Sequence, residues 1–372
     1  MSKVLLGDVA VEHKETCKGS KDGYPIVGLE HLIPEEITLT AWDEGGENTF
    51  SKMFRKGNVL FGRRRAYLKK AAVAPFDGIC SGDITVIEAK PDRILPELLP
   101  FIIQNDDLFD FAVGKSAGSL SPRVKWEHLK NYEFELPDME KQKELAELLW
   151  AMDNTKKSYQ KLIAATDELV KSQFMEQFGS REKGCYCTLE ECCVSVTGGS
   201  TPSMKREDYY GGDVPFIKSG DVKADYVSSG ALWLTQRALD ETTARYVPTG
   251  TVIVVTRSGI LKHNLPVAIT ENPVVINQDL KAFEPKPEFL PQYLAWAIRS
   301  KEDVLLSKTR AMTVDNIESR ELYEIPVMIV NIEEQEQFAA FVRQSDKSKF
   351  ELEKALSELT ATYKRIIAEN LG

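Results

Sequence analysis

The residues best suited to chemistry form a basic segment in the first half of the chain. Between Glu47 and Asp77 there is no acidic residue, and aromatic residues are interleaved with the cations. The cations of this window are Lys52, Arg55, Lys56, Arg63, Arg64, Arg65, Lys69 and Lys70. Lysine and arginine neutralise phosphate, and arginine also hydrogen-bonds base edges. We therefore expect the last five of them, Arg63 to Lys70, to bind DNA; a solvated charged hairpin is the alternative.

A second window has the same character in the second half of the chain. No acidic residue lies between Glu241 and Glu271. The window carries Arg245, Arg257, Lys262 and His263. We expect Arg257, Lys262 and His263 to form a second patch that contacts phosphate, with a charged hairpin again as the alternative.

A loop rich in glycine and hydroxyl groups occupies residues 198–203, Gly-Gly-Ser-Thr-Pro-Ser. The hydroxyls of Ser200 and Thr201, with the backbone N–H groups around them, suit contact with phosphate. A plain turn is the alternative, because Gly, Ser and Pro are turn formers.

Signals for catalysis are poor, and we expect no catalytic residue and no metal site. The pattern Asp83-x4-Glu88-x-Lys90, which recurs near residue 279, resembles that of a metal-dependent nuclease. On a straight strand, however, residues five apart point to opposite faces. We therefore interpret these residues as surface charges and keep a nuclease as an alternative function.

The charge and hydrophobic content of the chain limit the classes of protein to which it can belong. The 372 residues carry a formal net charge of −10, which excludes a uniformly basic DNA-coating protein, and the 42% hydrophobic content is enough for packed cores. No apolar run is long enough to span a bilayer and no signal peptide is expected, so we predict a cytoplasmic protein without membrane contact. The four cysteines at 185, 187, 192 and 193 have poor spacing for zinc, and we expect reduced thiols.

The elements that position these residues occur twice. When the sequence is shifted by 193 residues, the halves align, and Arg64 meets Arg257. Residues 139–178 align with 332–371 without a gap. Such self-similarity indicates two copies of one structural unit.

Each of the aligned stretches, 139–178 and 332–371, is expected to be one long helix, since neither contains Pro or Gly. At 1.5 Å per residue each would be roughly 55–60 Å long. Apolar residues at heptad spacing predict a coiled-coil pair, although Ser and Thr interrupt both seams. The alternative is that each helix packs only on its neighbouring module. The predicted seams are Leu145, Leu148, Met152, Tyr159, Leu162 and Leu169, and Phe338, Phe341, Leu352, Ala355, Leu359 and Ile366.

The predicted architecture is therefore a module at 1–138, a helix at 139–178, a second module at 184–331 and a helix at 332–371. Short β-branched runs, such as 251–255, alternate with helical patterns, such as 290–299. We expect each module to have an α+β fold with a curved sheet.

Five short segments stand out in the chain: Gly-Gly-Ser-Thr-Pro-Ser (198–203), Tyr-Pro-Ile-Val-Gly-Leu-Glu (24–30), Gly-Asn-Val-Leu-Phe-Gly-Arg (57–63), Gly-Ile-Cys-Ser-Gly-Asp (78–83) and Leu-Pro-Asp-Met-Glu-Lys-Gln (136–142). With the repeat and the long helix after each module, these segments resemble the DNA sequence-specificity subunit of type I restriction-modification systems. The chain is on the short side for that family.

The resemblance implies a non-catalytic subunit in which each module is a target-recognition domain for half of a bipartite DNA site. The long helices would pair antiparallel with a pseudo-twofold relation, set the spacing of the half-sites and dock two methyltransferase subunits. S-adenosylmethionine, ATP and Mg²⁺ would belong to partner subunits, and restriction subunits would complete the enzyme. A stand-alone DNA-binding regulator or structural protein is the alternative.

Overall fold

The computed structural model describes residues 2–45, 49–118, 121–179, 184–310 and 316–372. Glu47, the boundary of the first basic window, lies outside these ranges. The chain divides into two units: unit 1 is Met1–Lys161 with Glu353–Gly372, and unit 2 is Leu162–Leu352. Both boundaries fall inside long helices, so each unit contains part of α5 (Met139–Phe178) and part of α10 (Ile332–Leu371). These helices cover the residues for which long helices are predicted.

Unit 1 contains two four-stranded sheets, with orders β2-β9-β6-β7 and β4-β3-β8-β5, and a two-stranded sheet, β1-β10. The strands are β1 (Ser2–Leu5), β2 (Ala10–Glu12), β3 (Pro25–Val27), β4 (Asp43–Glu44), β5 (Lys52–Phe54), β6 (Val59–Gly62), β7 (Ala71–Val73), β8 (Gly78–Cys80), β9 (Ile84–Ala89) and β10 (Glu133–Leu136). The helices are α1 (Leu6–Val9), η1 (Ala66–Leu68), η2 (Pro96–Leu98), α2 (Leu99–Ile103), α3 (Asp106–Gly114) and α4 (Trp126–Leu129).

Unit 2 contains a five-stranded sheet, β12-β20-β17-β18-β14, a four-stranded sheet, β15-β13-β19-β16, and a two-stranded sheet, β11-β21. Its strands are β11 (Tyr186–Thr188), β12 (Cys193–Gly198), β13 (Tyr210–Ile217), β14 (Tyr226–Val227), β15 (Leu232–Leu234), β16 (Tyr246–Val247), β17 (Val252–Val255), β18 (Val267–Thr270), β19 (Val274–Ile276), β20 (Leu280–Pro285) and β21 (Pro326–Met328). Its helices are η3 (Glu207–Tyr209), η4 (Ser219–Asp221), α6 (Gln236–Glu241), η5 (Gly259–Lys262), α7 (Pro291–Arg299), α8 (Glu302–Arg310) and α9 (Ser319–Tyr323).

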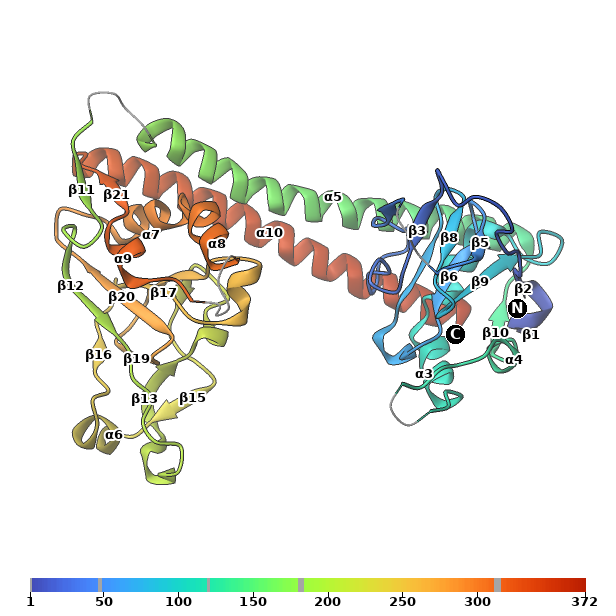
Figure 1. The fold of residues 1–372 in the computed structure, drawn as a ribbon, viewed down its shortest axis with the longest axis horizontal. Coiled ribbons are helices and arrows are strands. Elements are labelled where there is room, and N and C mark those ends of the chain that lie inside the picture. Colours follow the sequence, from blue (N-terminus) through green and yellow to red (C-terminus); the bar gives the residue numbers. More distant parts are fainter. Residues whose placement is uncertain (1, 46–48, 119–120, 180–183, 311–315) are drawn as a thin grey trace. The chain divides into compact units, whose positions relative to one another are not determined.

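The two units share one topology (Figure 1). The order β2-β9-β6-β7 recurs as β12-β20-β17-β18, to which unit 2 adds β14, and β4-β3-β8-β5 recurs as β15-β13-β19-β16. The same pair is parallel in each: β3 with β8, and β13 with β19. The predicted internal repeat and the mixed α+β class are therefore confirmed.

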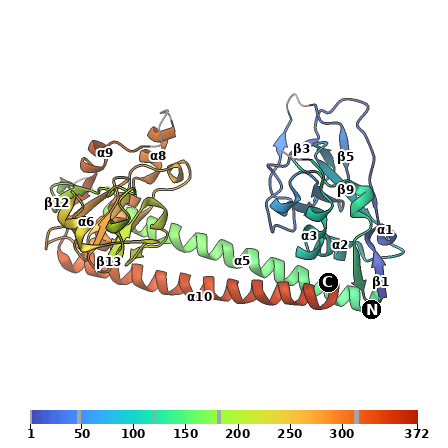
Figure 2. The same ribbon diagram turned by 90° about the horizontal axis from the view of Figure 1, so that it is seen from below.

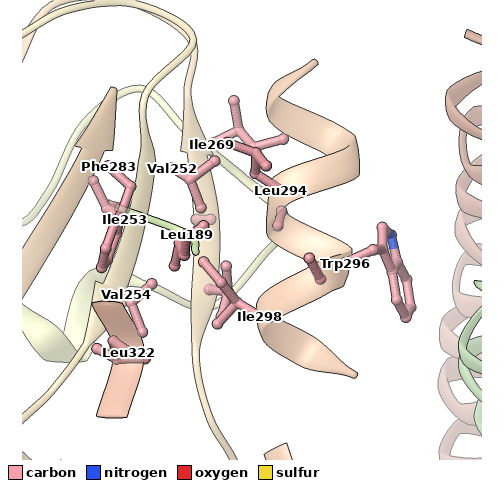
Figure 3. Packing of buried hydrophobic residues seen from close by; sticks show 14 of the residues in the cluster. Leu189, Val252, Ile253, Val254, Ile269, Phe283, Leu294, Trp296, Ile298 and Leu322 are labelled. Atoms are coloured by element: carbon pink, nitrogen blue, oxygen red, sulfur yellow. The ribbon is translucent and has the colours of Figure 1, made fainter. Parts of the chain in front are cut away.

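The core of unit 2 follows from its β-branched runs. β17 is Val-Ile-Val-Val, and all four residues are buried, because antiparallel strands flank it and helix α7 covers it. Pro291 starts α7, where its missing N–H costs nothing. Figure 3 shows Leu294 and Ile298 pointing from α7 toward the sheet, while Trp296 points away from it. Trp296 meets Phe338 of α10, with ring centroids 6.4 Å apart.

Within each unit, the long helices pack on each other and on the module. In unit 2, Phe174 and Phe178 of α5 contact Phe338 near the start of α10, with ring centroids 5.3 and 5.6 Å apart. In unit 1, the early part of α5 shares a core with Ile367 and Leu371 of α10. Figure 2 shows the C-terminal end of α10 beside the N-terminal part of α5. Opposite ends of the two helices thus meet within each unit.

The heptad seam predicted for α5 is wrong at three positions. Leu148, Leu162 and Leu169 are 46%, 51% and 54% exposed. Two predicted positions, Leu145 and Met152, are buried. The other buried residues of α5 are Gln142, Ala146, Leu149, Asp153, Val170, Phe174 and Phe178. The reason is that α5 packs on its module as well as on α10, so its buried face is offset from the predicted seam.

Candidate nucleic-acid interface

The first basic window leads into a loop at the end of β6, residues 63–70. The loop contains the short turn η1, and Arg65 and Lys69 on either side of it have left-handed backbones, with φ of 54° and 50°. Non-glycine residues adopt this conformation uncommonly. Ala66 is buried beneath the turn and anchors it. The turn is therefore held in one shape at the protein surface.

Arg63 and Arg64 fix the base of this loop. The backbone N–H of Arg63 donates to the carbonyl oxygen of Asp83 at 3.0 Å. The side chain of Arg64 donates to Ser121 Oγ at 2.6 Å and lies 3.4 Å from the Asp83 carboxylate. Asp83 also accepts two hydrogen bonds from Arg123, at 2.7 and 3.2 Å. The bond from Arg123, reinforced by Arg64, holds the pKa of Asp83 below its ordinary value.

Lys69 and Lys70 also have partners within the unit. Lys69 pairs with Asp106, and this hydrogen bond raises the pKa of the lysine. Lys70 donates to the carbonyl oxygen of Leu29 at 2.7 Å. Arg65 is exposed, and its side chain forms no ion pair or hydrogen bond with the described residues. Of the five cations predicted for this loop, Arg65 is thus the most available to an anionic ligand.

The cations in the earlier part of the first basic window form contacts within unit 1. Arg55 forms ion pairs with Glu15 and Asp77, and Lys52 donates to the carbonyl oxygen of Ile84 at 2.7 Å. These acidic partners lie at or beyond the ends of the window. The sequence pattern therefore overestimates the positive charge of this surface.

The second window builds the same loop at the end of β17. The N–H groups of Thr256 and Arg257 donate to the carbonyl oxygen of Asp279 at 2.8 and 3.3 Å, as Arg63 does to Asp83. Turn η5 follows at the repeat position of η1. Arg257, Lys262 and His263 are all exposed around it. The structure thus brings the three residues predicted to contact phosphate in unit 2 together on one surface loop.

Packing and hydrogen bonds within unit 2 explain the composition of the loop at 198–203. A side chain at Gly199 would overlap the carbonyl oxygens of Ile276 and Asn277, so only glycine fits there. Thr201 donates to the side chain of Gln278, and the Ser200 hydroxyl is buried without a hydrogen-bond partner in the described structure. The plain-turn alternative accounts for Gly199 and Thr201, and phosphate contact by Ser200 and Thr201 stays a prediction.

Asp83, Glu88 and Lys90 have different partners. Glu88 lies 2.7 Å from His13 Nδ1, and Lys90 donates to the carbonyl oxygen of Gly7 at 2.7 Å. Within the described ranges, no three His, Cys, Asp or Glu side chains are arranged to hold a metal ion. The geometry therefore offers no support for the nuclease alternative.

Of the four clustered cysteines, Cys192 and Cys193 lie in the core of unit 2, Cys187 packs against that core, and Cys185 is exposed. Cys187 and Cys192 have their sulfur atoms 2.9 Å apart, and both are free thiols. Burial raises the pKa of Cys192, and it raises that of Cys193 to about 12. Such thiols are poor nucleophiles, because the thiolate is the reactive form.

Sequence reasoning missed two features of the loops. Arg123, bound to Asp83, comes from a segment 40 residues away, and no local pattern indicates it. Tyr67 and Ile260 are exposed apolar residues inside the basic windows, a combination visible in the sequence once the two loops are aligned.

No helix in the described part of the chain is both long and apolar enough to cross a membrane.

Comparison with known families gives a match along most of the chain. A family model described as the type I restriction modification DNA specificity domain matches residues 6–165 and 186–360. Each match covers one repeat and runs into the long helix that follows it.

Curated relatives are similar over part of their length. The type I restriction enzyme EcoR124I/EcoR124II specificity subunit of Escherichia coli is 29% identical over 152 residues, which cover 40% of this chain and 38% of that protein. The MjaIX specificity subunit of Methanocaldococcus jannaschii is 31% identical over 156 residues, 41% of this chain and 35% of that protein. The chain thus matches little more than a third of the length of these relatives.

Solved structures share the fold along nearly the whole chain. A chain from a structure of complex assembly in the type I R-M system has a TM-score of 0.61 at 19% identity, covering 99% of this chain and 96% of that chain. The type I restriction-modification S subunit of M. genitalium has a TM-score of 0.56 at 13% identity, covering 98% and 94%. At these identities, the likeness concerns the fold.

Proposed function

The chain belongs to the type I restriction modification DNA specificity domain family, and we propose that it is the DNA-reading subunit of a type I restriction-modification enzyme. Each repeat reads one half of a bipartite site in double-stranded DNA. The observation that carries the proposal is the duplicated loop: residues 63–70 and 256–263 occupy the same place in the same topology, and each presents cations at its surface. Such loops suit contact with phosphate and base edges.

The long helices have two roles in this proposal. They pair antiparallel as a coiled coil, relate the repeats by a pseudo-twofold axis and set the spacing of the half-sites. The contacts of Phe174 and Phe178 with Phe338 in unit 2, and of α5 with Ile367 and Leu371 in unit 1, support the antiparallel pairing.

The second role is docking of two methyltransferase subunits. An exposed stripe on α5 consists of uncharged residues at alternating spacings of three and four, although charged residues make up 28% of the chain. Residues three and four apart lie on one helix face, as in a coiled-coil seam, so the stripe suits a partner helix. Its members are Leu148, Ala151, Thr155, Ser158, Leu162, Ala165, Leu169 and Ser172.

Catalysis belongs to the partners in this proposal. The methyltransferase subunits bind S-adenosylmethionine, and restriction subunits, where they join, use ATP and Mg²⁺. The chain itself contributes sequence recognition in the cytoplasm.

Methylation mapping tests the function directly. The chain is co-expressed with its methyltransferase subunit in a host that lacks other DNA methylation, and the modified sites are sequenced. We expect one bipartite motif that disappears when the chain is omitted. Methylation without the chain, or of a continuous motif unaffected by changes in unit 2, would contradict the proposal.

A further inference from the structure

An exposed apolar side chain lies at the apex of the same turn in both repeats. Tyr67 is 54% exposed and Ile260 is 41% exposed. They are matched by the 193-residue shift, and each is the second residue of its turn, η1 or η5. The same turn therefore presents a large apolar side chain to solvent in both repeats.

The surrounding residues hold these side chains outward. Ala66, just before Tyr67, is 2% exposed, and Leu261, just after Ile260, is fully buried. In unit 2 the Ser258 hydroxyl also accepts a hydrogen bond from the N–H of Ile260, at 3.4 Å. Since each turn is anchored through a neighbouring residue, the apical side chain cannot fold into the core without breaking that anchor.

The charge around each apex selects the kind of partner. In unit 1, Arg65 precedes Tyr67, and Lys69, which is paired with Asp106, follows it; in unit 2, Arg257 precedes Ile260 and Lys262 follows it. Neither loop contains an acidic residue. A polyanion with apolar edges fits such a surface, and duplex DNA has both, with phosphates flanking grooves that expose base edges and thymine methyl groups.

We propose that Tyr67 and Ile260 are specificity-determining residues that enter a DNA groove and contact base edges, one in each half-site. This inference rests on the proposed function and adds to it the side chains that read the bases. The flanking cations then contact phosphate and fix the depth of insertion.

The two residues differ in what they read. The Tyr67 ring contacts bases through its face, and its hydroxyl can donate a hydrogen bond to a base acceptor. Ile260 has only apolar contacts to offer, such as the thymine methyl group. The half-sites are therefore read by different chemistry, although the repeats share a fold.

The test uses the full chain with its methyltransferase subunits and compares methylation motifs. We expect Tyr67→Ala to relax one half of the bipartite motif and Ile260→Ala to relax the other. Discrimination at the affected position should fall about 5- to 100-fold, the usual effect of losing one base contact. Tyr67→Phe separates the ring from the hydroxyl: it should preserve discrimination that depends on the ring alone.

Matched controls and a second readout keep the result decisive. Leu5→Ala in unit 1 and Val194→Ala in unit 2 remove other exposed apolar side chains and should leave the motif unchanged. Binding of variant complexes to duplexes should keep the salt dependence of the unaltered complex, because no phosphate contact is lost. A thermal unfolding midpoint equal to that of the unaltered chain shows that each variant is folded.

The possible results distinguish a failure of the Tyr67 and Ile260 assignment from a failure of the proposed function. If the unaltered complex shows no motif, the proposed function fails. If it shows a bipartite motif that both alanine variants retain, or if both relax the same half, the assignment of Tyr67 and Ile260 fails while the function stands.

Discussion

Gln142 and Gln335, which are buried and occupy the same repeat position in the first turns of α5 and α10, make the same hydrogen bond. The Oε1 atom of Gln142 accepts from the N–H of Leu95 at 2.8 Å, and that of Gln335 accepts from the N–H of Leu290 at 2.8 Å. The Nε2 atom of each glutamine also donates to a backbone carbonyl oxygen, which for Gln142 is that of Pro137. Each glutamine therefore joins a long helix to the segment that precedes a module helix.

Replacing either glutamine should destabilise its own unit. Gln142→Ala leaves the partly buried N–H of Leu95 and the buried carbonyl of Pro137 without partners, and each such group costs about 1–3 kcal/mol. We expect a loss of about 2–4 kcal/mol in the free energy of unfolding, measured in urea, and a similar loss for Gln335→Ala. Gln160→Ala and Gln344→Ala, at exposed positions of the same helices, are the controls. Equal stability of variants and controls would show that the bonds are dispensable.

Arg65 should contribute to DNA affinity in a salt-dependent way. Its side chain is exposed and is not held by an acidic group of the described structure, whereas Arg64 is held by Asp83 and Ser121. We expect Arg65→Ala to weaken binding by the complex and to reduce the slope of log affinity against log salt by about 1. Fluorescence anisotropy at several salt concentrations measures both. Arg93→Ala, at an exposed arginine outside the window, should change neither, and identical behaviour of the two variants would undercut the interface.

Replacement of Arg64 should act differently, because its side chain holds the base of the loop, whereas Arg63 holds it through a backbone N–H that alanine keeps. We expect Arg63→Ala and Arg64→Ala to weaken DNA binding by the complex, with Arg64→Ala also releasing Ser121 from its 2.6 Å hydrogen bond. Hydrogen exchange of residues 63–70 would reveal the loosened loop. Unchanged binding by both variants would show that the loop base is not needed for recognition.

The stability of unit 2 should depend on Asp346 at mildly acidic pH. Burial, with the nearby Asp225, raises the pKa of Asp346 to about 6, although Arg299 and Lys349 oppose the rise. A carboxyl whose pKa is raised by folding is tolerated best when protonated. Its contribution is therefore most favourable below about pH 4 and is lost as pH rises toward 6.

Asp346→Asn should accordingly stabilise the chain at pH 8 and have little effect near pH 4. We expect a gain of about 1 kcal/mol at pH 8, less than the full shift implies, because the side chain is only partly buried and solvent screens it. Urea unfolding at the two pH values measures the difference. Asp213→Asn, at an exposed site in the same unit, is the control. A gain that is the same at both pH values would contradict the assignment.

The exposed stripe of α5 should be needed for assembly and not for folding. Leu169→Glu places a charge on the stripe while keeping a good helix former, so we expect an unchanged unfolding midpoint and at least tenfold weaker binding of the methyltransferase subunit. Val304→Glu, at another exposed apolar site of unit 2, should leave assembly intact. Analytical ultracentrifugation of the mixed subunits distinguishes the two. Normal assembly of Leu169→Glu would place the docking surface elsewhere.

The repeat and the long helices could be predicted from sequence because their signals are local: a constant shift between the halves, and 40 residues without Pro or Gly. The seam could not, because Leu148 and Leu162 have the right residue type but face away from a core that the fold places elsewhere. The pairing of the basic loop with acidic residues could not be predicted from sequence either. Asp83 and Asp106 reach it across 19 and 37 residues of sequence, a distance that no window analysis covers.

Unit 1 is assembled from both ends of the chain. Ile367 and Leu371 lie in its core, and the side chain of Asn105 donates to the backbone carbonyl of Leu371 at 3.2 Å. During synthesis on the ribosome, the module translated first must therefore wait, with part of its apolar surface uncovered, until residues 353–372 emerge. Unit 2, formed by one continuous stretch of chain, has no such delay. The order of translation and the order of completed folding are thus opposite in this molecule.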